Sequence, residues 1–272
     1  MRTYFEEEKY KLILGDCIDV MKSLPEKSVD MIFADPPYFL SSDGITCSSG
    51  KMVSVNKGAW DTGRSIEKIH DFNMAWIKEC KRILKDDGTI WISGTQHNIY
   101  SIGFSLQKLN YKILNSIVWY KRNAPPNLSC RYFTHSTEII IWAKKMKGKH
   151  TFNYEIMKNS NNSKQMRDVW LDICGEYGES EITSDLWILP AINKKEKQYG
   201  YFPTQKPIKL LERIVLSCTD EGQLIMDPFN GSGTTGIVAI STNRKFIGID
   251  INEEYLELSK TRYMNLEQRI QF

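Results

Sequence analysis

Clustered cysteines and long apolar runs are both missing from this chain of 272 residues. Its six cysteines form no C-x-x-C pair, although zinc sites and disulfide frameworks usually show such close spacing. No stretch approaches the ~18 consecutive apolar residues that would suggest a membrane span, and residues 1–11 lack the apolar core of a secretion signal. We therefore expect a reduced, cytoplasmic protein without a metal site or a membrane segment.

A strong net charge is also lacking. The chain has 36 basic and 33 acidic residues, which gives a formal net charge of only +3. The basic residues are unevenly spread, because seven of them lie between residues 144 and 167, where Glu155 is the single acid. A local excess of this kind suits the phosphate backbone of a nucleic acid. On charge alone, a solvated run of lysines is an equal alternative.

Short apolar segments alternate with amphipathic segments along most of the chain, which is the pattern of parallel strands joined by helices. Strands are predicted at residues 10–14, 29–34, 89–93, 112–120, 138–143, 223–226 and 245–249, and helices at 17–24, 66–84, 97–109, 207–218, 234–242 and from 253 onward. Residues 144–200 differ, because they are polar and without clear periodicity. We predict one α/β domain formed by residues 1–143 and 201–272, with a loop-rich lobe at 144–200 outside the main sheet.

A glycine-rich turn follows the strand predicted at residues 223–226. Residues 229–236 read Phe-Asn-Gly-Ser-Gly-Thr-Thr-Gly, which places G-x-G-x-x-G between a strand and a helix. Glycine is needed there because the backbone must turn tightly and let a ligand approach without a Cβ in the way. Asp250 ends the next predicted strand, where its carboxylate can accept hydrogen bonds from ribose hydroxyls. The pattern predicts a site for an adenosine-containing cofactor, with NAD as one alternative.

Two features argue against NAD. Asp227 ends the strand before the turn, and a carboxylate there would repel a pyrophosphate but attract a sulfonium or an α-amino group. Only 22 residues follow Asp250, which is too few for the remaining strands of a dinucleotide domain. Those strands must come from the N-terminal part, so the cofactor unit is predicted to be permuted.

A second turn joins a buried strand to two prolines. Residues 31–38 read Met-Ile-Phe-Ala-Asp-Pro-Pro-Tyr, and the prolines stiffen the backbone at the strand's carboxyl end, where open α/β sheets bind ligands. The Asp35 carboxylate and the Pro36 carbonyl can accept hydrogen bonds from the two N–H groups of an aromatic amine. The nitrogen can then move towards tetrahedral geometry, which frees its lone pair for alkylation. Tyr38 offers a face on which a base can stack. The turn predicts methylation of the amino nitrogen of adenine or cytosine.

Together the two turns resemble those of the permuted β group of DNA amino-methyltransferases, in which D-P-P-Y precedes F-x-G-x-G. The similarity covers nearly the whole chain, and residues 32–40, 126–135 and 165–170 are especially similar to the second adenine methyltransferase of Dpn/Mbo-type restriction systems, which acts at GATC. The resemblance implies an S-adenosylmethionine-dependent, site-specific adenine-N6 DNA methyltransferase. It also implies a circularly permuted, Rossmann-like fold with a mostly parallel seven-stranded sheet, and a role in target recognition for residues 144–200.

The resemblance assigns roles to individual residues. Catalysis is expected from Asp35, Pro36, Pro37 and Tyr38. The cofactor is expected to contact Asp16, Cys17, Asp35, Thr204, Gln205, Lys206, Asp227, Phe229, Gly231, Gly233, Thr234, Thr235 and Asp250. DNA is expected to contact Arg131, Tyr132, His135, Lys144, Lys145, Lys164 and Arg167. The expected partners are single- or double-stranded DNA, with a second copy of the chain and a cognate restriction endonuclease as further candidates.

Two departures from the family pattern concern single regions. Phe202 stands where the family commonly has His, and the stretch between Trp170 and Trp187 is longer, which leaves the recognition sequence open. Glu138 lies near the expected DNA contacts, and a core strand with satisfied polar residues is the alternative there.

Three other functions remain as alternatives. The first is cytosine-N4 methylation, although Asp35 favours adenine because cytosine enzymes more often have Ser at that position. The second is a protein that binds cofactor and nucleic acid without catalysing transfer, against which the intact acceptor pair argues. The third is methylation of RNA or of a protein amide, where related enzymes usually carry Asn in place of Asp35.

Overall fold

The computed structural model describes residues 1–39, 45–48, 51–54, 65–121, 124, 126–172 and 205–270. Its strands are β1 (Arg2–Glu6), β2 (Tyr10–Leu14), β3 (Val29–Ala34), β4 (Ile45–Ser48), β5 (Lys51–Ser54), β6 (Leu84–Gly94), β7 (Tyr111–Lys121), β8 (Thr137–Lys145), β9 (Val169–Asp172), β10 (Leu224–Asp227) and β11 (Lys245–Asp250). Its helices are α1 (Cys17–Ser23), α2 (Ile66–Ile83), α3 (Ile99–Lys108), α4 (Tyr154–Asn159), α5 (Ile208–Cys218), α6 (Thr234–Ser241) and α7 (Glu253–Ile270).

Within the described residues, nine strands form one sheet in the order β1-β2-β11-β10-β3-β6-β8-β7-β9, and β4 and β5 form a separate hairpin. The strands from β2 to β6 in this order are parallel, while β8 runs antiparallel to both of its neighbours and β1 antiparallel to β2. The predicted α/β class and mostly parallel sheet are confirmed. The predicted number of seven strands was wrong, because β1 and β9 each extend one edge of the sheet.

The position of β10 and β11 confirms the predicted permutation. Both strands come from the C-terminal part of the chain, yet they lie between β2 and β3 of the N-terminal part. The glycine-rich turn after β10 is therefore brought next to the turn after β3, although the two are far apart in sequence.

One part of the prediction for residues 144–200 was wrong. Residues 144 and 145 are the last residues of β8, and β9 pairs in parallel with β7, from Val118 opposite Val169 onward. A strand of four residues is too short to produce a periodic signal, so the sequence does not predict it. Pairing with the edge of β7 stabilises β9 in the sheet. Helix α4 lies outside the sheet, and residues 173–200 lie outside the described residues.

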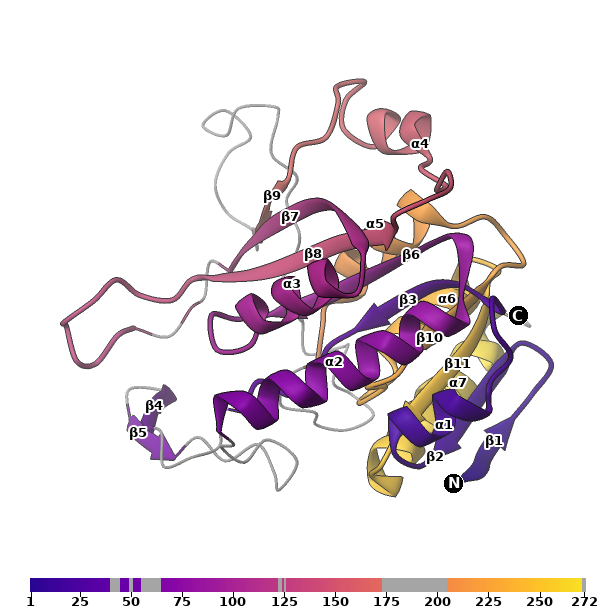
Figure 1. Ribbon diagram of the computed structural model, residues 1–272, viewed down its shortest axis with the longest axis horizontal. Coiled ribbons are helices and arrows are strands. Elements are labelled where there is room, and N and C mark those ends of the chain that lie inside the picture. Colours follow the sequence, from indigo (N-terminus) through magenta and orange to yellow (C-terminus); the bar gives the residue numbers. More distant parts are fainter. Residues whose placement is uncertain are drawn as a thin grey trace.

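The two faces of the sheet carry separate hydrophobic cores, each covered by helices (Figure 1). Helices α1, α2 and α3 pack on one face, and α5, α6 and α7 on the other. Strand β3 is buried throughout and alternates between them, with Met31 and Phe33 in one core and Ile32 and Ala34 in the other. A strand covered on both faces needs apolar residues on both of them, which explains the apolar run from Met31 to Ala34. Asp30, the one polar residue of β3, is paired with Lys85 at 2.7 Å.

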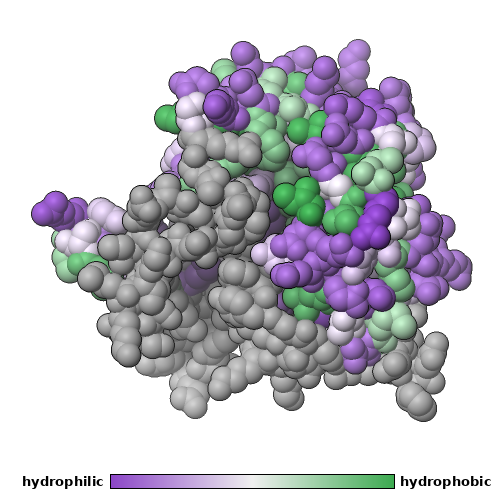
Figure 2. Space-filling view, turned by 90° about the horizontal axis from the view of Figure 1, so that it is seen from below, coloured by the Kyte–Doolittle hydropathy of each residue, from purple (hydrophilic) through white to green (hydrophobic). Residues whose placement is uncertain are grey.

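The outer surface of the described residues is mainly hydrophilic in the view from below, where hydrophobic residues form small groups among polar ones (Figure 2). Of the helices that the structure describes, none has the length and apolar character that crossing a membrane requires.

Candidate active site

Several strands bring polar residues to one edge of the sheet. Strand β3 pairs with β6 so that Asp35 and Ser93 occupy neighbouring positions at this edge. Strand β8 runs in the opposite direction, and its beginning, with Glu138, reaches the same edge. On its other side β3 pairs with β10, which ends at Asp227. The carboxyl ends of the parallel strands thus form the site, as open α/β sheets generally do.

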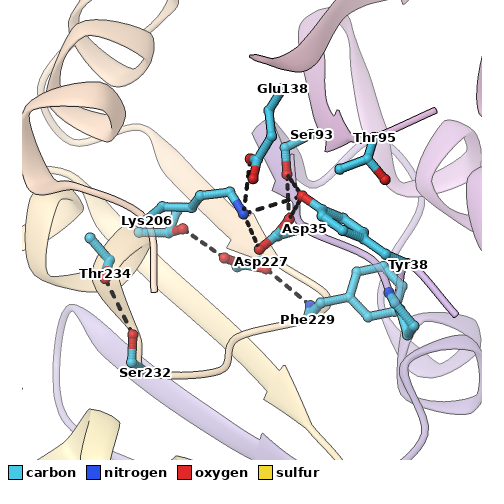
Figure 3. A network of polar contacts seen from close by, with 12 residues as sticks. Asp35, Tyr38, Ser93, Thr95, Glu138, Lys206, Asp227, Phe229, Ser232 and Thr234 are labelled. Atoms are coloured by element: carbon cyan, nitrogen blue, oxygen red, sulfur yellow. Dashed lines mark hydrogen bonds and ion pairs between the residues drawn. The ribbon is translucent and has the colours of Figure 1, made fainter. Parts of the chain in front are cut away.

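The Asp35 carboxylate is held by three donors (Figure 3). Its Oδ1 accepts hydrogen bonds from the Tyr38 hydroxyl, at 2.7 Å, and from the Ser93 hydroxyl. Its Oδ2 accepts one from Lys206 Nζ at 2.6 Å. A carboxylate offers about four acceptor positions, so these three contacts leave one position on Oδ2 for a further donor.

The turn after Asp35 is fixed from a second direction. Asn98 Nδ2 donates to the Pro37 carbonyl at 3.3 Å, and Asn98 Oδ1 accepts a hydrogen bond from the Thr95 amide. The stiff backbone expected from Pro36 and Pro37 is therefore also anchored to the start of α3.

Tyr38 joins the Asp35 network through its hydroxyl, which lies 3.3 Å from both Ser93 Oγ and Lys206 Nζ. Its side chain is only 6% exposed. Burial, followed by the charges of Asp35 and Glu138, raises the pKa of Tyr38 well above its usual value, so the hydroxyl keeps its proton. The sequence predicts a base stacked on this ring. Because the ring is buried here, such stacking requires that it first be uncovered.

Lys206 is expected from the sequence to hold the cofactor, but the structure places its ammonium between two carboxylates. Nζ lies 2.6 Å from Asp35 Oδ2 and 3.6 Å from Glu138 Oε2. Burial lowers the pKa of Lys206, but Asp35 and Glu138 more than offset this effect, so its pKa is raised and the ammonium stays charged. Lys206 therefore belongs to the Asp35 network.

The glycine-rich turn is built on the Asp227 carboxylate at the end of β10. Its Oδ1 accepts a hydrogen bond from the Phe229 amide at 3.0 Å, and its Oδ2 accepts one from the Thr235 hydroxyl at 2.6 Å. Burial raises the pKa of Asp227 to about 7. A cation bound nearby would favour the ionised carboxylate at neutral pH.

Two glycines give the turn its shape. Gly231 and Gly233 have φ values of 49° and 72°, in the left-handed region that glycine adopts most readily. The Gly231 amide donates to Asp250 Oδ2 at 2.8 Å. A Cβ on Gly233 would lie 1.9 Å from Ser259 Oγ, so this position excludes any side chain.

Asp250 ends β11 and faces the turn from the neighbouring strand. Its Oδ1 accepts a hydrogen bond from the Asn252 amide at 2.9 Å. Burial raises the pKa of Asp250 to about 6, although hydrogen bonds from the backbone partly oppose that effect. The carboxylate is therefore ionised above about pH 6 and keeps acceptor positions for ribose hydroxyls.

A cavity lies between the two turns. It is lined by Gly15, Asp16, Cys17, Asp35, Pro37, Phe39, Phe72, Pro228, Phe229, Gly231, Asp250, Ile251 and Tyr255. S-adenosylmethionine has a cationic sulfur, ribose hydroxyls and an adenine ring. The cavity offers carboxylates for the cation and the hydroxyls, aromatic rings for the adenine, and a glycine backbone that allows close approach. The lining residues fit this cofactor.

The structure separates the residues predicted to hold the cofactor into two groups. Those that line the cavity are Asp16, Cys17, Asp35, Phe229, Gly231 and Asp250. Those that do not line it are Gln205, Lys206, Asp227, Gly233, Thr234 and Thr235. Members of the second group support the turn from behind: Thr234 Oγ1, for example, accepts a hydrogen bond from Arg262 Nη1 at 3.0 Å. Thr204 lies outside the described residues.

Three of the residues predicted to contact DNA are exposed on the segment 126–136. Arg131, Tyr132 and His135 all lie there, and His135 Nε2 is 3.2 Å from Gln96 Nε2. That contact ties the segment to the turn that follows β6, so these residues lie beside the edge that carries Asp35. Lys164 and Arg167 are exposed in the connection between α4 and β9.

The structure places Lys144 and Lys145, which the sequence predicts to contact DNA, away from the candidate active site. They end β8, and the register sets Lys144 opposite Thr89, at the edge of the sheet away from Asp35. Lys144 is buried and donates to the Gly148 carbonyl at 2.6 Å. Lys145 pairs with Asp86 at 3.3 Å. A count of basic residues along the sequence does not reveal which edge of the sheet they reach.

Ser93 and Lys121 belong to the network but received no role from the sequence. Ser93 donates to Asp35, and Lys121 is paired with Glu138. The available signal for Ser93 was its place at the end of an apolar strand. The signal for Glu138 was a carboxylate next to the apolar run 139–143. Neither pattern names a partner. Among the described residues, no group of His, Cys, Asp and Glu side chains is arranged to hold a metal ion.

The sequence model of the N6/N4 DNA methylase family matches residues 29–261. The chain is 49% identical to the type II methyltransferase M2.MboI of Moraxella bovis, over 97% of this chain and 91% of that protein. It is 50% identical to the type II methyltransferase M2.DpnII of Streptococcus pneumoniae, over 96% of this chain and 92% of that protein.

Two solved structures share the fold at lower sequence identity. The PvuII cytosine-N4-specific DNA methyltransferase superposes with a TM-score of 0.72 at 17% identity, over 96% of this chain and 89% of that one. The complex of M1.HpyAVI with S-adenosylmethionine superposes with a TM-score of 0.62 at 24% identity, over 93% and 98% of the two chains. The chain belongs to the N6/N4 DNA methylase family and is an S-adenosylmethionine-dependent type II DNA methyltransferase.

Proposed function

We propose that this enzyme methylates the N6 nitrogen of adenine in DNA, and that Asp35 is the residue on which transfer depends. The observation that carries the proposal is the open acceptor position on Asp35 Oδ2, next to the cavity that Gly231 and Asp250 also line. The close similarity to M2.MboI and M2.DpnII supports a place in a restriction–modification system. It also supports GATC as the target sequence.

S-adenosylmethionine, when bound in the cavity, supplies an electrophilic methyl group. Asp35 Oδ2 and the Pro36 carbonyl each accept a hydrogen bond from one N–H of the adenine amino group. These two bonds draw the nitrogen towards tetrahedral geometry. The charge-assisted bond to Asp35 is worth about 1.5–3 kcal/mol, or about one to two decades of rate if it forms fully in the transition state. After transfer, the surplus proton on the nitrogen passes to Asp35.

Ser93 and Lys206 prepare Asp35 for this role. Their hydrogen bonds fix the plane of the carboxylate before the substrate arrives, so little orientational freedom is lost during transfer. The raised pKa of Tyr38 keeps its hydroxyl protonated, because burial and the nearby carboxylates oppose its ionisation. The Tyr38 hydroxyl therefore acts as a third fixed donor to the carboxylate.

The segment 126–136 is proposed to face DNA. It carries Arg131, Tyr132 and His135, and Phe133 is 95% exposed. A base must leave its stack to reach Asp35, which costs a few kcal/mol in a duplex and least in a single strand. Exposed aromatic rings and a cation beside the site can bind the strand that is being opened. Lys164 and Arg167 are proposed to bind phosphates farther out.

Cytosine-N4 methylation is the second candidate. The PvuII structure shares the fold but is only 17% identical, so it does not decide between the bases, whereas the acid in Asp35-Pro36-Pro37-Tyr38 favours adenine. The decisive experiment is expression of the chain in cells without DNA methylation, followed by nucleoside mass spectrometry and methylation sequencing. N6-methyladenine at GATC is expected. N4-methylcytosine would overturn the proposed base, and N6-methyladenine at another sequence would overturn GATC alone.

The remaining expectations concern location and partners. The enzyme is proposed to act in the cytoplasm, alongside an endonuclease that cuts the same unmethylated sequence. A dimer of the chain is a separate proposal, which sedimentation of the purified enzyme with and without DNA would test.

A further inference from the structure

Four charged side chains form a row of alternating sign that ends at Asp35. Lys121 on β7 is paired with Glu138 on β8. Glu138 Oε2 lies 3.6 Å from Lys206 Nζ, and Lys206 Nζ lies 2.6 Å from Asp35 Oδ2 (Figure 3). The side chains of Glu138, Lys206 and Asp35 are 14% exposed or less, while that of Lys121 is 33% exposed. We call this row the charge row.

The position of Lys206 creates an electrostatic difficulty for the proposed reaction. Positive charge develops on the amino nitrogen during methyl transfer, while that nitrogen is bound to Asp35. The Lys206 ammonium contacts the same carboxylate oxygen and therefore repels the developing charge. In a buried site this repulsion is weakly screened, so it must be balanced by another group.

Glu138 is placed to provide that balance. Burial opposes its ionisation, but the charges of Lys206 and Lys121 more than offset the effect, so the pKa of Glu138 is lowered and the side chain is ionised. Its Oε1 accepts a hydrogen bond from Lys121. Its Oε2 is buried without a hydrogen-bond partner among the described residues and faces the Lys206 ammonium across 3.6 Å. This oxygen acts on Lys206 through charge, at a distance longer than a hydrogen bond.

We propose that Glu138 is a positioning residue that cancels the charge of Lys206, so that Lys206 can orient Asp35 without repelling the reacting nitrogen. This inference rests on the proposed role of Asp35. In the charge row the four formal charges sum to zero. Loss of the Glu138 charge leaves one uncompensated positive charge next to the acceptor carboxylate.

The first test is the isosteric variant Glu138→Gln. We expect kcat to fall about tenfold to a hundredfold, because the repulsion between Lys206 and the reacting nitrogen grows as positive charge develops in the transition state. The KM values for DNA and for S-adenosylmethionine should change less than about threefold. Glu212→Gln removes a partly exposed acid on α5 that pairs with Lys209, and it should leave kcat unchanged. A Glu138→Gln variant with wild-type kcat would overturn the inference.

The second test removes both charges. The double variant Glu138→Gln/Lys206→Met restores a net charge of zero to the charge row, so it should turn over faster than Glu138→Gln alone. If Glu138 only stabilised the fold, a second buried substitution would slow the enzyme further. A double variant no faster than the single variant overturns the proposal. Thermal melting of both variants identifies any loss due to unfolding.

The third test is the pH profile. Asp35, Tyr38 and Glu138 face Lys206 among the described residues, and both carboxylates raise the pKa of Lys206 against the effect of burial. Without Glu138 its pKa falls, so the ammonium loses its proton at alkaline pH and kcat of Glu138→Gln should recover there relative to wild type. A constant ratio of the two profiles contradicts the inference. Activity retained by Asp35→Asn would instead contradict the proposed role of Asp35 itself.

Discussion

The Lys206 ammonium lies 2.6 Å from the Asp35 carboxylate, although the two residues are 171 positions apart in the sequence. The contact joins the segment before α5 to the turn after β3, and so links the two halves of the permuted fold at the place where the base is proposed to bind. The orientation of Asp35 therefore depends on both halves of the chain being correctly packed.

Removal of the Ser93 hydroxyl should slow transfer without weakening cofactor binding. Ser93→Ala loses one hydrogen bond to Asp35 Oδ1, while Tyr38 and Lys206 still hold the carboxylate. Because these two donors remain, we expect kcat to fall only about threefold to tenfold, which is less than the one to two decades of rate that a whole charge-assisted hydrogen bond can supply. Steady-state transfer of labelled methyl groups to DNA measures the effect. The control is Ser241→Ala, whose hydroxyl bonds the Val238 carbonyl within α6; equal losses in both variants would argue against a role for Ser93.

Two glycines with similar backbone angles should respond differently to alanine. Gly233 and Gly222 have φ values of 72° and 79°, so each alanine pays about 1–2 kcal/mol for the left-handed backbone. A Cβ on Gly233 also meets Ser259 Oγ at 1.9 Å, whereas nothing lies within 4 Å of one on Gly222. Chemical denaturation should show the larger loss of stability for Gly233→Ala. The affinity for S-adenosylmethionine should fall for Gly233→Ala and stay unchanged for Gly222→Ala. Equal affinity of the wild type and both variants would show that the turn is not where the cofactor binds.

Cofactor binding should weaken as the pH falls below about 6. Burial raises the pKa of Asp250 to about 6, so its carboxylate is ionised above that pH and becomes protonated below it. The protonated form accepts hydrogen bonds from ribose hydroxyls and from the Gly231 amide less well. Titration calorimetry of S-adenosylmethionine should show the rise in Kd at the acid end of a series from pH 5 to pH 8. These limits lie about one to two units from the pKa of Asp250. Asp250→Asn should bind S-adenosylmethionine weakly at every pH. If Asp250→Asn kept the wild-type pH dependence, the titration would belong to another group.

Phe133 should matter more for duplex DNA than for a single strand. Its side chain is 95% exposed in the segment beside the site, where an apolar ring can enter the space left by a displaced base. We expect Phe133→Ala to lower kcat/KM about tenfold on a duplex and less than about twofold on a single strand, because a single strand has no stack to open. The control is Met146→Ala, an exposed apolar residue just beyond β8 at the opposite edge. Equal losses on both substrates would contradict this role.

The sequence predicted the parts of the site that are contained in one short segment. Asp35 and Tyr38 lie in a single turn, and Gly231 and Gly233 in another, so local residue order is enough to identify both. Asp250 was predicted because it ends a strand at a fixed spacing from that turn. In each case the chemistry and the backbone geometry are encoded by neighbouring residues.

The sequence does not predict features that depend on which segments pack together. The contacts of Lys206 with Asp35 and Glu138 could not be predicted, because those two residues come from distant strands. The position of Lys144 could not be predicted either, because the sequence does not show that β8 runs antiparallel and ends at the far edge. Strand β9 was missed because four residues carry no periodic signal, and only the edge of β7 makes them a strand.

The most direct test of the account is Asp35→Ala, measured for binding and for transfer in the same preparation. The carboxylate is proposed to hold the amino group of the base, while Gly231 and Asp250 hold most of the cofactor, so S-adenosylmethionine should still bind, with Kd within about tenfold of wild type by calorimetry. Transfer of tritiated methyl groups to DNA should fall by at least about a hundredfold. If the variant binds the cofactor and methylates DNA at the wild-type rate, Asp35 is not the acceptor and the account is wrong.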